Sequence, residues 1–261
     1  TRNRGGVPAN FRNYFIIESD KPFNLTYTAS DSIVKSNSLE VSSAHAQAAI
    51  GFKTAKGEVV HLRVASSFIS YEQAELNLHR EIGKQTLPQI KSKAKQAWHQ
   101  ELSKVVVEGG TPDQIKTFYS CLYRMLQFPR KFYEFDANQK MVHYSPFNGK
   151  VEDGILFTDT GFWDTFRSLF PFLTLMYPEM DRQMMQGMVN TYKESGWLPE
   201  WATPGHRATM IGSNSASVIT DAYTKGIRGF DINTLYEALM KNTEQQGPLN
   251  TLGRNGVKEY N

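Results

Sequence analysis

The sequence has little of several features that mark common classes of protein. Among 261 residues there is one cysteine, Cys121, so neither an intramolecular disulfide nor a cysteine-based metal site is expected. No run of about eighteen apolar residues is present, so we expect no membrane span. The N-terminal residues lack the apolar stretch of a secretory signal. Lys and Arg are scattered and the net charge is only +3, so nucleic acid is not an expected partner.

The first seventy or so residues are instead rich in short β-type runs separated by polar turns. Strands are predicted near residues 14–17, 25–28, 48–52 and 58–65. In the last run Val60, Leu62 and Val64 alternate with polar residues, which predicts a half-buried antiparallel strand. The Ser-rich segment 30–43 indicates strand edges and loops, because Ser and Asn favour local turns.

Helical patterns fill the remainder. Residues 71–102 predict a helical linker, and the Thr-Pro-Asp-Gln string at Thr111 is a capping box that predicts a helix ending by Pro129. The segment 162–176 predicts a helix kinked or broken at Pro171. Further helices are predicted at 178–195, 215–225 and 231–241, from caps and apolar spacing. We therefore expect an entirely helical C-terminal half, a toroid or solenoid of helical hairpins whose loops at one end carry the function.

Two segments are too polar and aromatic to be simple connectors. Their composition suits a sugar site, because flat aromatic faces stack on the C–H side of a pyranose and planar charged groups pair with vicinal hydroxyls. The first segment, 161–167, contains Trp163, Asp164 and Arg167; the second, 196–215, contains Trp197, Glu200, Trp201, His206, Arg207 and Asn214.

Each of these residues also has a plain structural interpretation. Asp164 and Arg167 are three apart and could form a local ion pair on a helix, and the loop tryptophans could simply pack in a core. Glu200 lies between a proline and a tryptophan, where desolvation could raise its pKa as a general acid requires, or it could be a solvated loop glutamate. His206 favours a structural or substrate contact over a metal ligand.

At these loops the chain resembles glycoside hydrolase family 92, the calcium-dependent exo-acting α-mannosidases. The resemblance lies in four strings: Gly161–Arg167, Leu198–Trp201, Met210–Gly212 and Asp221–Gly226. It extends to residues 67–74 and to the helix after Thr111. It implies an α+β multidomain fragment. The end of an N-terminal β-sandwich would occupy 1–70, a helical linker 71–108, and the first half of an (α/α)6 toroid 109–261, the rest of the polypeptide being missing.

The resemblance also implies an activity. The family releases terminal α-linked mannose from mannose-containing glycans by inversion, one carboxylic acid protonating the leaving oxygen while a carboxylate activates water. Calcium is the implied cofactor, with its main ligands and the general base in later motifs, so the fragment alone should be inactive. A periplasmic, extracellular or cell-surface location follows by family analogy alone.

The sequence departs from the family at two positions. Many members have a glutamate, the general acid, four residues before Met-Ile-Gly and a histidine shortly after it; this chain has His206 and Asn214 there. Glu200 is the nearest carboxyl and is predicted as the substitute acid. Two alternatives stay open: a non-catalytic carbohydrate-binding member of the same fold, and another (α/α)6 glycosidase such as a glucoamylase-like enzyme.

Overall fold

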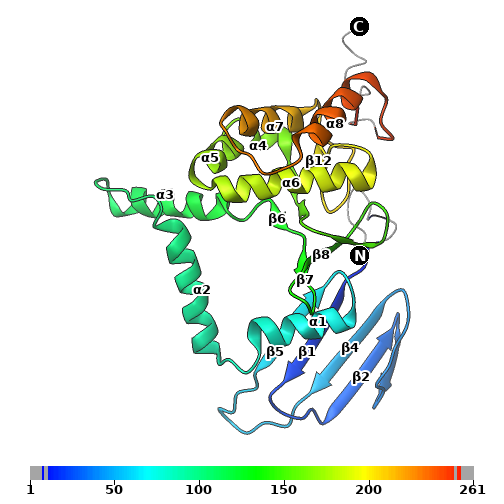
Figure 1. The fold of residues 1–261 in the computed structure, drawn as a ribbon. Coiled ribbons are helices and arrows are strands. Elements are labelled where there is room, and N and C mark those ends of the chain that lie inside the picture. The colour runs from blue at the N-terminus through cyan, green and yellow to red at the C-terminus, as the bar shows by residue number, and fades with distance from the viewer. Residues whose placement is uncertain (1–7, 9–10, 250–251, 254–261) are drawn as a thin grey trace. The chain divides into compact units, whose positions relative to one another are not determined.

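The computed structural model describes residues 8, 11–249 and 252–253 (Figure 1). The chain divides into two compact units. One unit is Tyr14–Lys84, and the other contains Gln85 onward together with the short segment before Tyr14. The coarse order, a β-rich N-terminal region followed by helices, is as predicted. The sandwich, the toroid and the two boundaries between the three predicted regions stay predictions.

The N-terminal unit contains five strands and a short helical segment. β1 (Tyr14–Ser19) pairs antiparallel with β5 (Leu62–Ser67), while β2 (Leu25–Ser30) lies between β3 (Ile33–Ser36) and β4 (Ala46–Gly51) in a second antiparallel sheet. A two-residue turn joins β2 to β3, with Asp31 at φ 52° as such hairpins require. Helix α1 (Tyr71–Asn77) begins at Ser70, whose hydroxyl accepts from the Gln73 N–H, and it continues into one π-helical turn, η1 (Leu78–Ile82).

The sheet of β1 and β5 has one helix-covered face and one exposed apolar face. Helix α1 covers the first face, where the Tyr14 and Tyr71 rings lie 5.6 Å apart. On the other face Ile17 lies opposite Val64, and these side chains are 48% and 53% exposed. The predicted antiparallel strand is present with alternating burial, but it begins at Leu62, and its more exposed side carries the apolar residues Leu62 and Val64. Strand β3 lies inside the segment 30–43, which was predicted as strand edges and loops. The sequence did not predict β3 as a strand of its own because four residues are too few to show a period.

Seven α-helices are described in the C-terminal unit: α2 (Leu87–Leu102), α3 (Pro112–Met125), α4 (Phe162–Thr165), α5 (Leu169–Met176), α6 (Pro178–Ser195), α7 (Asn214–Thr224) and α8 (Ile232–Glu244). The predicted caps are confirmed. Thr111 and Gln114 form the capping box, and the Asp231 carboxylate accepts from the Thr234 N–H. Gly196 ends α6 with φ 78°, a left-handed conformation that glycine adopts without steric cost.

The prediction of a kink at Pro171 is wrong. The helix breaks earlier, between α4 and α5, at Phe166–Ser168. Pro171 is the third residue of α5, where a backbone N–H would have no partner within the helix in any case.

The prediction of an entirely helical C-terminal half is also wrong. Between α3 and α4 lie β6 (Arg130–Lys131), β7 (Glu134–Phe135), β8 (Met141–Tyr144), β9 (Val151–Asp153), β10 (Phe157–Thr158) and β11 (Thr160–Gly161), and β12 (Trp201–Ala202) follows α6. Strands β7, β8 and β9 form an antiparallel sheet, and β6 pairs with β10. Runs of two to four residues carry no hydrophobic period, so the sequence gives no sign of them.

Helices α5 to α8 enclose the apolar core of this unit (Figure 1). Met184 and Met188 of α6, which are four residues apart and belong to the apolar spacing from which this helix was predicted, are each 4% exposed, and Met185 beside them is 0% exposed. Asp181 is a buried polar exception: its Oδ2 lies 2.8 Å from Thr174 Oγ1, while Oδ1 has no hydrogen-bond partner in the described structure. Burial raises the pKa of Asp181 to about 6.

Candidate functional site

A short β-ladder brings the two predicted site segments together. Strand β11 pairs antiparallel with β12, so that Gly161 lies opposite Trp201. The ladder is extended by the Phe162 N–H, which donates to the Glu200 carbonyl at 3.0 Å. A third motif joins them, because Met210 Cε lies only 2.9 Å from where a Cβ at Gly161 would be. The Trp163 helix end and the loop around residue 200 therefore lie side by side.

The first turn of α4 presents an aromatic and charged surface. Trp163 is 40% exposed, and Asp164 is exposed at the helix N-terminus, where the helix dipole favours a negative charge. The interpretation of Asp164 and Arg167 as a local ion pair is wrong, since no such pair occurs among the described residues. Arg167 instead donates from Nη1 to the Trp163 carbonyl at 3.0 Å, and its guanidinium lies 4.9 Å from the Trp163 ring centroid. The Asp164 carboxylate is left available to a ligand.

Glu200 is a buried carboxyl at the N-terminus of α7. Only 1% of the residue is exposed. Its Oε2 accepts from the backbone N–H groups of Asn214 at 2.8 Å and Ser215 at 3.3 Å, and its Oε1 lies 2.7 Å from Ser215 Oγ. Burial raises the pKa of Glu200 to about 7, and these hydrogen bonds act in the opposite direction. The interpretation as a solvated loop glutamate is wrong, because both oxygens are buried and bonded.

The His206 side chain contacts Ser195, at the end of α6, and Phe147, in the loop between β8 and β9. Its Nε2 lies 2.9 Å from Ser195 Oγ, and its ring lies 4.8 Å from the Phe147 ring. The other ring nitrogen, Nδ1, is buried without a hydrogen-bond partner in the described structure. Burial lowers the pKa of His206 to about 4, so the ring is neutral at pH 7. These contacts match the structural alternative predicted for His206; contact with substrate stays a prediction.

The remaining predicted site residues lie in two places: Arg207 and Asn214 are bonded within the loop that follows Trp201, and Trp197 packs against helix α8. The Arg207 N–H donates to the Trp201 carbonyl at 2.9 Å and its Nε to the Thr203 carbonyl at 2.8 Å, closing the hairpin after Trp201. Asn214 Nδ2 donates to the Ile211 carbonyl at 2.8 Å. Trp197 lies elsewhere: its ring centroid is 4.6 Å from Lys241 Nζ of α8. The structure therefore places Trp201 and Trp163 near the ladder, and Trp197 against α8.

Ser215 is a contributor that sequence reasoning missed. It supplies two of the three hydrogen bonds to Glu200. Its position in the first turn of α7 was the available signal, since the first N–H groups of a helix have no partner within it and attract carboxylates.

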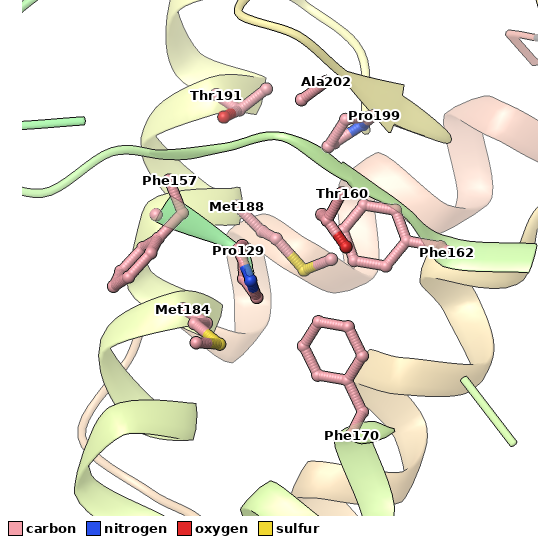
Figure 2. A pocket seen from close by; sticks show the side chains of 11 residues that line it. Pro129, Phe157, Thr160, Phe162, Phe170, Met184, Met188, Thr191, Pro199 and Ala202 are labelled. Carbon is pink, nitrogen blue, oxygen red and sulfur yellow. The ribbon is translucent and has the colours of Figure 1, made fainter. Parts of the chain in front are cut away.

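A small cavity lies next to the ladder, lined in part by Thr160, Phe162, Phe170 and Met188 (Figure 2). Its volume is about 20 Å³, enough for one water molecule. Pockets that enclose small-molecule ligands are usually above roughly 300 Å³. This cavity is therefore too small for a sugar ring, whereas Trp163 and Asp164 lie on the exposed surface.

Comparison with known proteins identifies the class. The Glycosyl hydrolase family 92 catalytic domain matches residues 73–261. The chain belongs to this family.

Several relatives are known. The chain is similar to an inverting mannosidase of family 92 from Bacteroides thetaiotaomicron, with 44% identity and a TM-score of 0.95 over 99% of this chain and 35% of that structure. An α-mannosidase of the same family and organism, solved in complex with mannoimidazole, is 26% identical with a TM-score of 0.76, over 87% of this chain and 31% of that one. An uncharacterized secreted glycosidase of Arthroderma benhamiae is 27% identical over 208 residues, 77% of this chain and 22% of the fungal protein.

The chain thus spans about a third or less of the length of these relatives. In the part of the chain that the structure describes, no helix is long and apolar enough to cross a membrane.

Proposed function

We propose that the protein carrying this chain is an exo-acting α-mannosidase that releases terminal α-linked mannose from glycans with inversion. The observation that carries this proposal is the 44% identity and TM-score of 0.95 shared with an inverting mannosidase over nearly the whole chain. The secreted glycosidase among the relatives supports a location outside the cytoplasm, in the periplasm or at the cell surface.

The residues beside the β11–β12 ladder would hold the terminal sugar. The exposed Trp163 ring offers a flat face to the C–H side of a pyranose, and the free Asp164 carboxylate can accept from two vicinal hydroxyls. Arg167, stacked on Trp163, adds a planar donor. Trp201, Arg207 and Asn214 would contribute from the adjoining loop, and Trp197 and His206 would support it from within.

Inversion requires a carboxylic acid and a carboxylate roughly 6.5–9.5 Å apart on opposite sides of the sugar. Within this proposal Glu200 is the acid: a pKa of about 7 keeps about half of it protonated near neutrality. Its hydrogen bonds to α7 support a different role, that of a helix cap. Within this proposal the general base is a second carboxylate of the full-length protein, and none of the described residues is assigned to it.

Calcium remains a proposal drawn from the family. Asp164 offers carboxylate oxygens of the kind that Ca²⁺ prefers. The described residues, however, include no group of three or more His, Cys, Asp or Glu side chains placed to hold a metal ion.

Release of mannose from α-linked disaccharides by the full-length protein tests the proposal. We expect mannose as the product, inverted at the anomeric carbon when followed by NMR, and strongly reduced release by Asp164→Asn. Glucose as the only product would overturn the proposal in favour of a glucoamylase-like enzyme.

The engagement of both Glu200 oxygens favours one other function, that of a carbohydrate-binding member without catalysis. Calorimetry distinguishes the two. Mannoside binding without any release would establish the non-catalytic alternative.

A further inference from the structure

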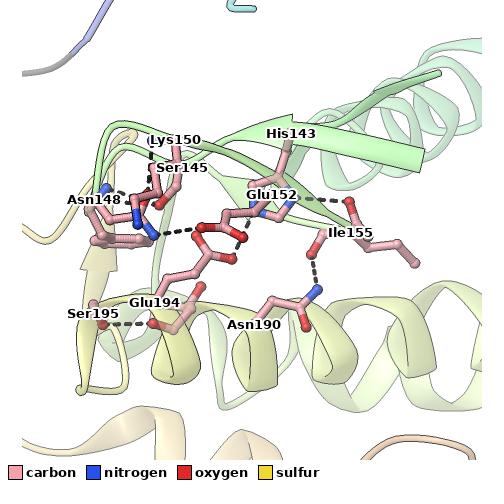
Figure 3. Close-up of polar contacts among 12 residues, drawn as sticks. His143, Ser145, Asn148, Lys150, Glu152, Ile155, Asn190, Glu194 and Ser195 are labelled. Carbon is pink, nitrogen blue, oxygen red and sulfur yellow. Dashed lines mark hydrogen bonds and ion pairs between the residues drawn. The ribbon is translucent and has the colours of Figure 1, made fainter. Parts of the chain in front are cut away.

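The β8–β9 hairpin is joined to the end of α6 through a buried histidine and a buried glutamate (Figure 3). The side chains of His143, on β8, and Glu194, on α6, are 0% and 8% exposed. His143 Nε2 lies 2.8 Å from Glu194 Oε1, and Nδ1 lies 2.9 Å from the Gly154 carbonyl oxygen. A second link lies beside it, where Asn190 Nδ2 donates to the Ile155 carbonyl at 2.8 Å.

The partners of His143 indicate a charged ring. A backbone carbonyl and an ionised carboxylate both accept hydrogen bonds, and only an imidazolium has N–H groups on both ring nitrogens to satisfy them. Burial lowers the pKa of His143, but the bonds to Glu194 and Gly154 outweigh it and the pKa is raised overall. Glu152 lies directly opposite His143 in the ladder and adds a further negative charge, so Glu194 from α6 and Glu152 from β9 both favour the imidazolium.

The same junction reaches the segment 196–207. Ser195 follows Glu194 in the sequence. The Ser195 hydroxyl oxygen accepts from the backbone N–H of Trp197 at 3.1 Å and lies 2.9 Å from His206 Nε2. From the hairpin side the Phe147 ring lies against His206. The β8–β9 hairpin is therefore connected to both ends of this segment, through Glu194 at its start and through His206 near its end.

We propose that His143 and Glu194 are positioning residues, whose buried ion pair fixes the segment 196–207 against the β8–β9 hairpin and so holds the sugar-binding loop in place. This inference rests on the proposed function for its effect on catalysis. Glu194 Oε2 is buried without a partner in the described structure, so His143 supplies the main compensation for its charge. Removing either partner leaves a lone buried charge, which is far more costly than removing both.

Amide hydrogen exchange on the full-length protein tests the positioning role without reference to catalysis. Glu194→Gln and His143→Gln should each raise exchange within 196–207 at least roughly tenfold, while the double variant, which leaves no lone charge, should raise it less than either. Glu152→Gln is the matched control: it removes a nearby charge but no bond to α6, and exchange should not change. Exchange in 196–207 that is unaffected by both single variants would overturn the proposal.

The charge of His143 can be measured in the wild-type protein, so this second test does not require any variant to fold. Nitrogen-15 NMR of the histidine rings should show two protonated nitrogens on His143 at about pH 7, where an unperturbed histidine is mostly neutral. A neutral ring would overturn the proposal.

The effect on catalysis is measured last. We expect Glu194→Gln to lower kcat/KM for mannose release roughly tenfold or more and to move the alkaline limb of the pH profile to lower pH, because the histidine loses its carboxylate partner. Wild-type protein that releases no mannose would refute the proposed function, while the exchange and NMR measurements would still decide the positioning role.

Discussion

Replacing Glu200 with glutamine separates the two roles that the buried carboxyl could have. Glutamine has the same shape, and its carbonyl oxygen can accept from the Asn214 and Ser215 N–H groups while its amide donates to Ser215 Oγ, so the cap on α7 is preserved. It cannot donate a proton to a leaving group. If Glu200 is the acid, Glu200→Gln should lower kcat for mannose release by roughly 10²–10⁴-fold without loss of folding.

The same substitution should change the pH dependence of stability. The pKa of Glu200 is 4.5 when exposed and about 7 in the folded protein, so the folded state binds the proton more tightly. Its contribution to stability is complete below pH 4.5 and is lost as the pH rises through 7. Across those two and a half pKa units the loss approaches about 3 kcal/mol. Glu200→Gln should lack this loss and should unfold at a higher temperature than wild type at about pH 8.

Two assays on the full-length protein decide the matter: steady-state mannose release, and thermal unfolding at about pH 5 and about pH 8. Glu200→Ala is the companion variant. It removes the cap and leaves buried donors unpaired, so it should lower the free energy of unfolding by about 1–3 kcal/mol. Wild-type activity in Glu200→Gln, combined with destabilised Glu200→Ala, would refute the acid role and leave only the cap.

Three further substitutions and one treatment test other parts of the structure. Asp181→Asn should raise the free energy of unfolding at about pH 8 by up to about 3 kcal/mol, because the pKa of Asp181 is raised from 3.8 to about 6 and its charge is costly above that pH; denaturant unfolding at two pH values measures this. Asp164→Asn should lower kcat/KM roughly 10- to 100-fold through loss of a charged hydrogen bond, with an unchanged melting temperature because the side chain is exposed; unchanged kinetics would exclude it from the sugar site. Gly196→Ala should cost about 1 kcal/mol, since φ is 78° there, and calorimetry of the melting transition would detect it. Chelation of calcium should abolish mannose release and added Ca²⁺ should restore it; full activity in chelator would exclude the cofactor.

The parts of the fold that the sequence predicts well are those with local determinants. The capping box at Thr111 and the left-handed stop at Gly196 depend on residues within one helical turn, and both are confirmed. The prediction of a kink at Pro171 failed because the effect of a proline depends on its position in a helix. A proline breaks an interior turn but is tolerated in the first turn, where Pro171 lies. The strands β6 to β12 have only two to four residues each, too few to show a period, and two of their pairings, β6 with β10 and β11 with β12, join segments far apart in the sequence.

The candidate site divides in the same way. The composition of the two segments indicated sugar binding, and the pairing of Gly161 with Trp201 brings the two segments together. What a single sequence could not supply is the partner of each side chain. Glu200 was expected to face solvent or substrate, yet it caps α7 through Asn214 and Ser215, fourteen and fifteen residues further along the chain. His143 and Glu194 are 51 residues apart and gave no motif at all.

The ladder of β11 and β12 has two residues on each side, and that brevity restricts how the chain can vary. Successive residues of a strand point to opposite faces, so a slip of one residue would turn Trp201 over and place Ala202 opposite Gly161. We therefore expect that active relatives have no insertion or deletion between Gly196 and Trp201. Changes of length are better accommodated beyond Arg207, where Ala208 and Thr209 are exposed and no ladder has to stay in register.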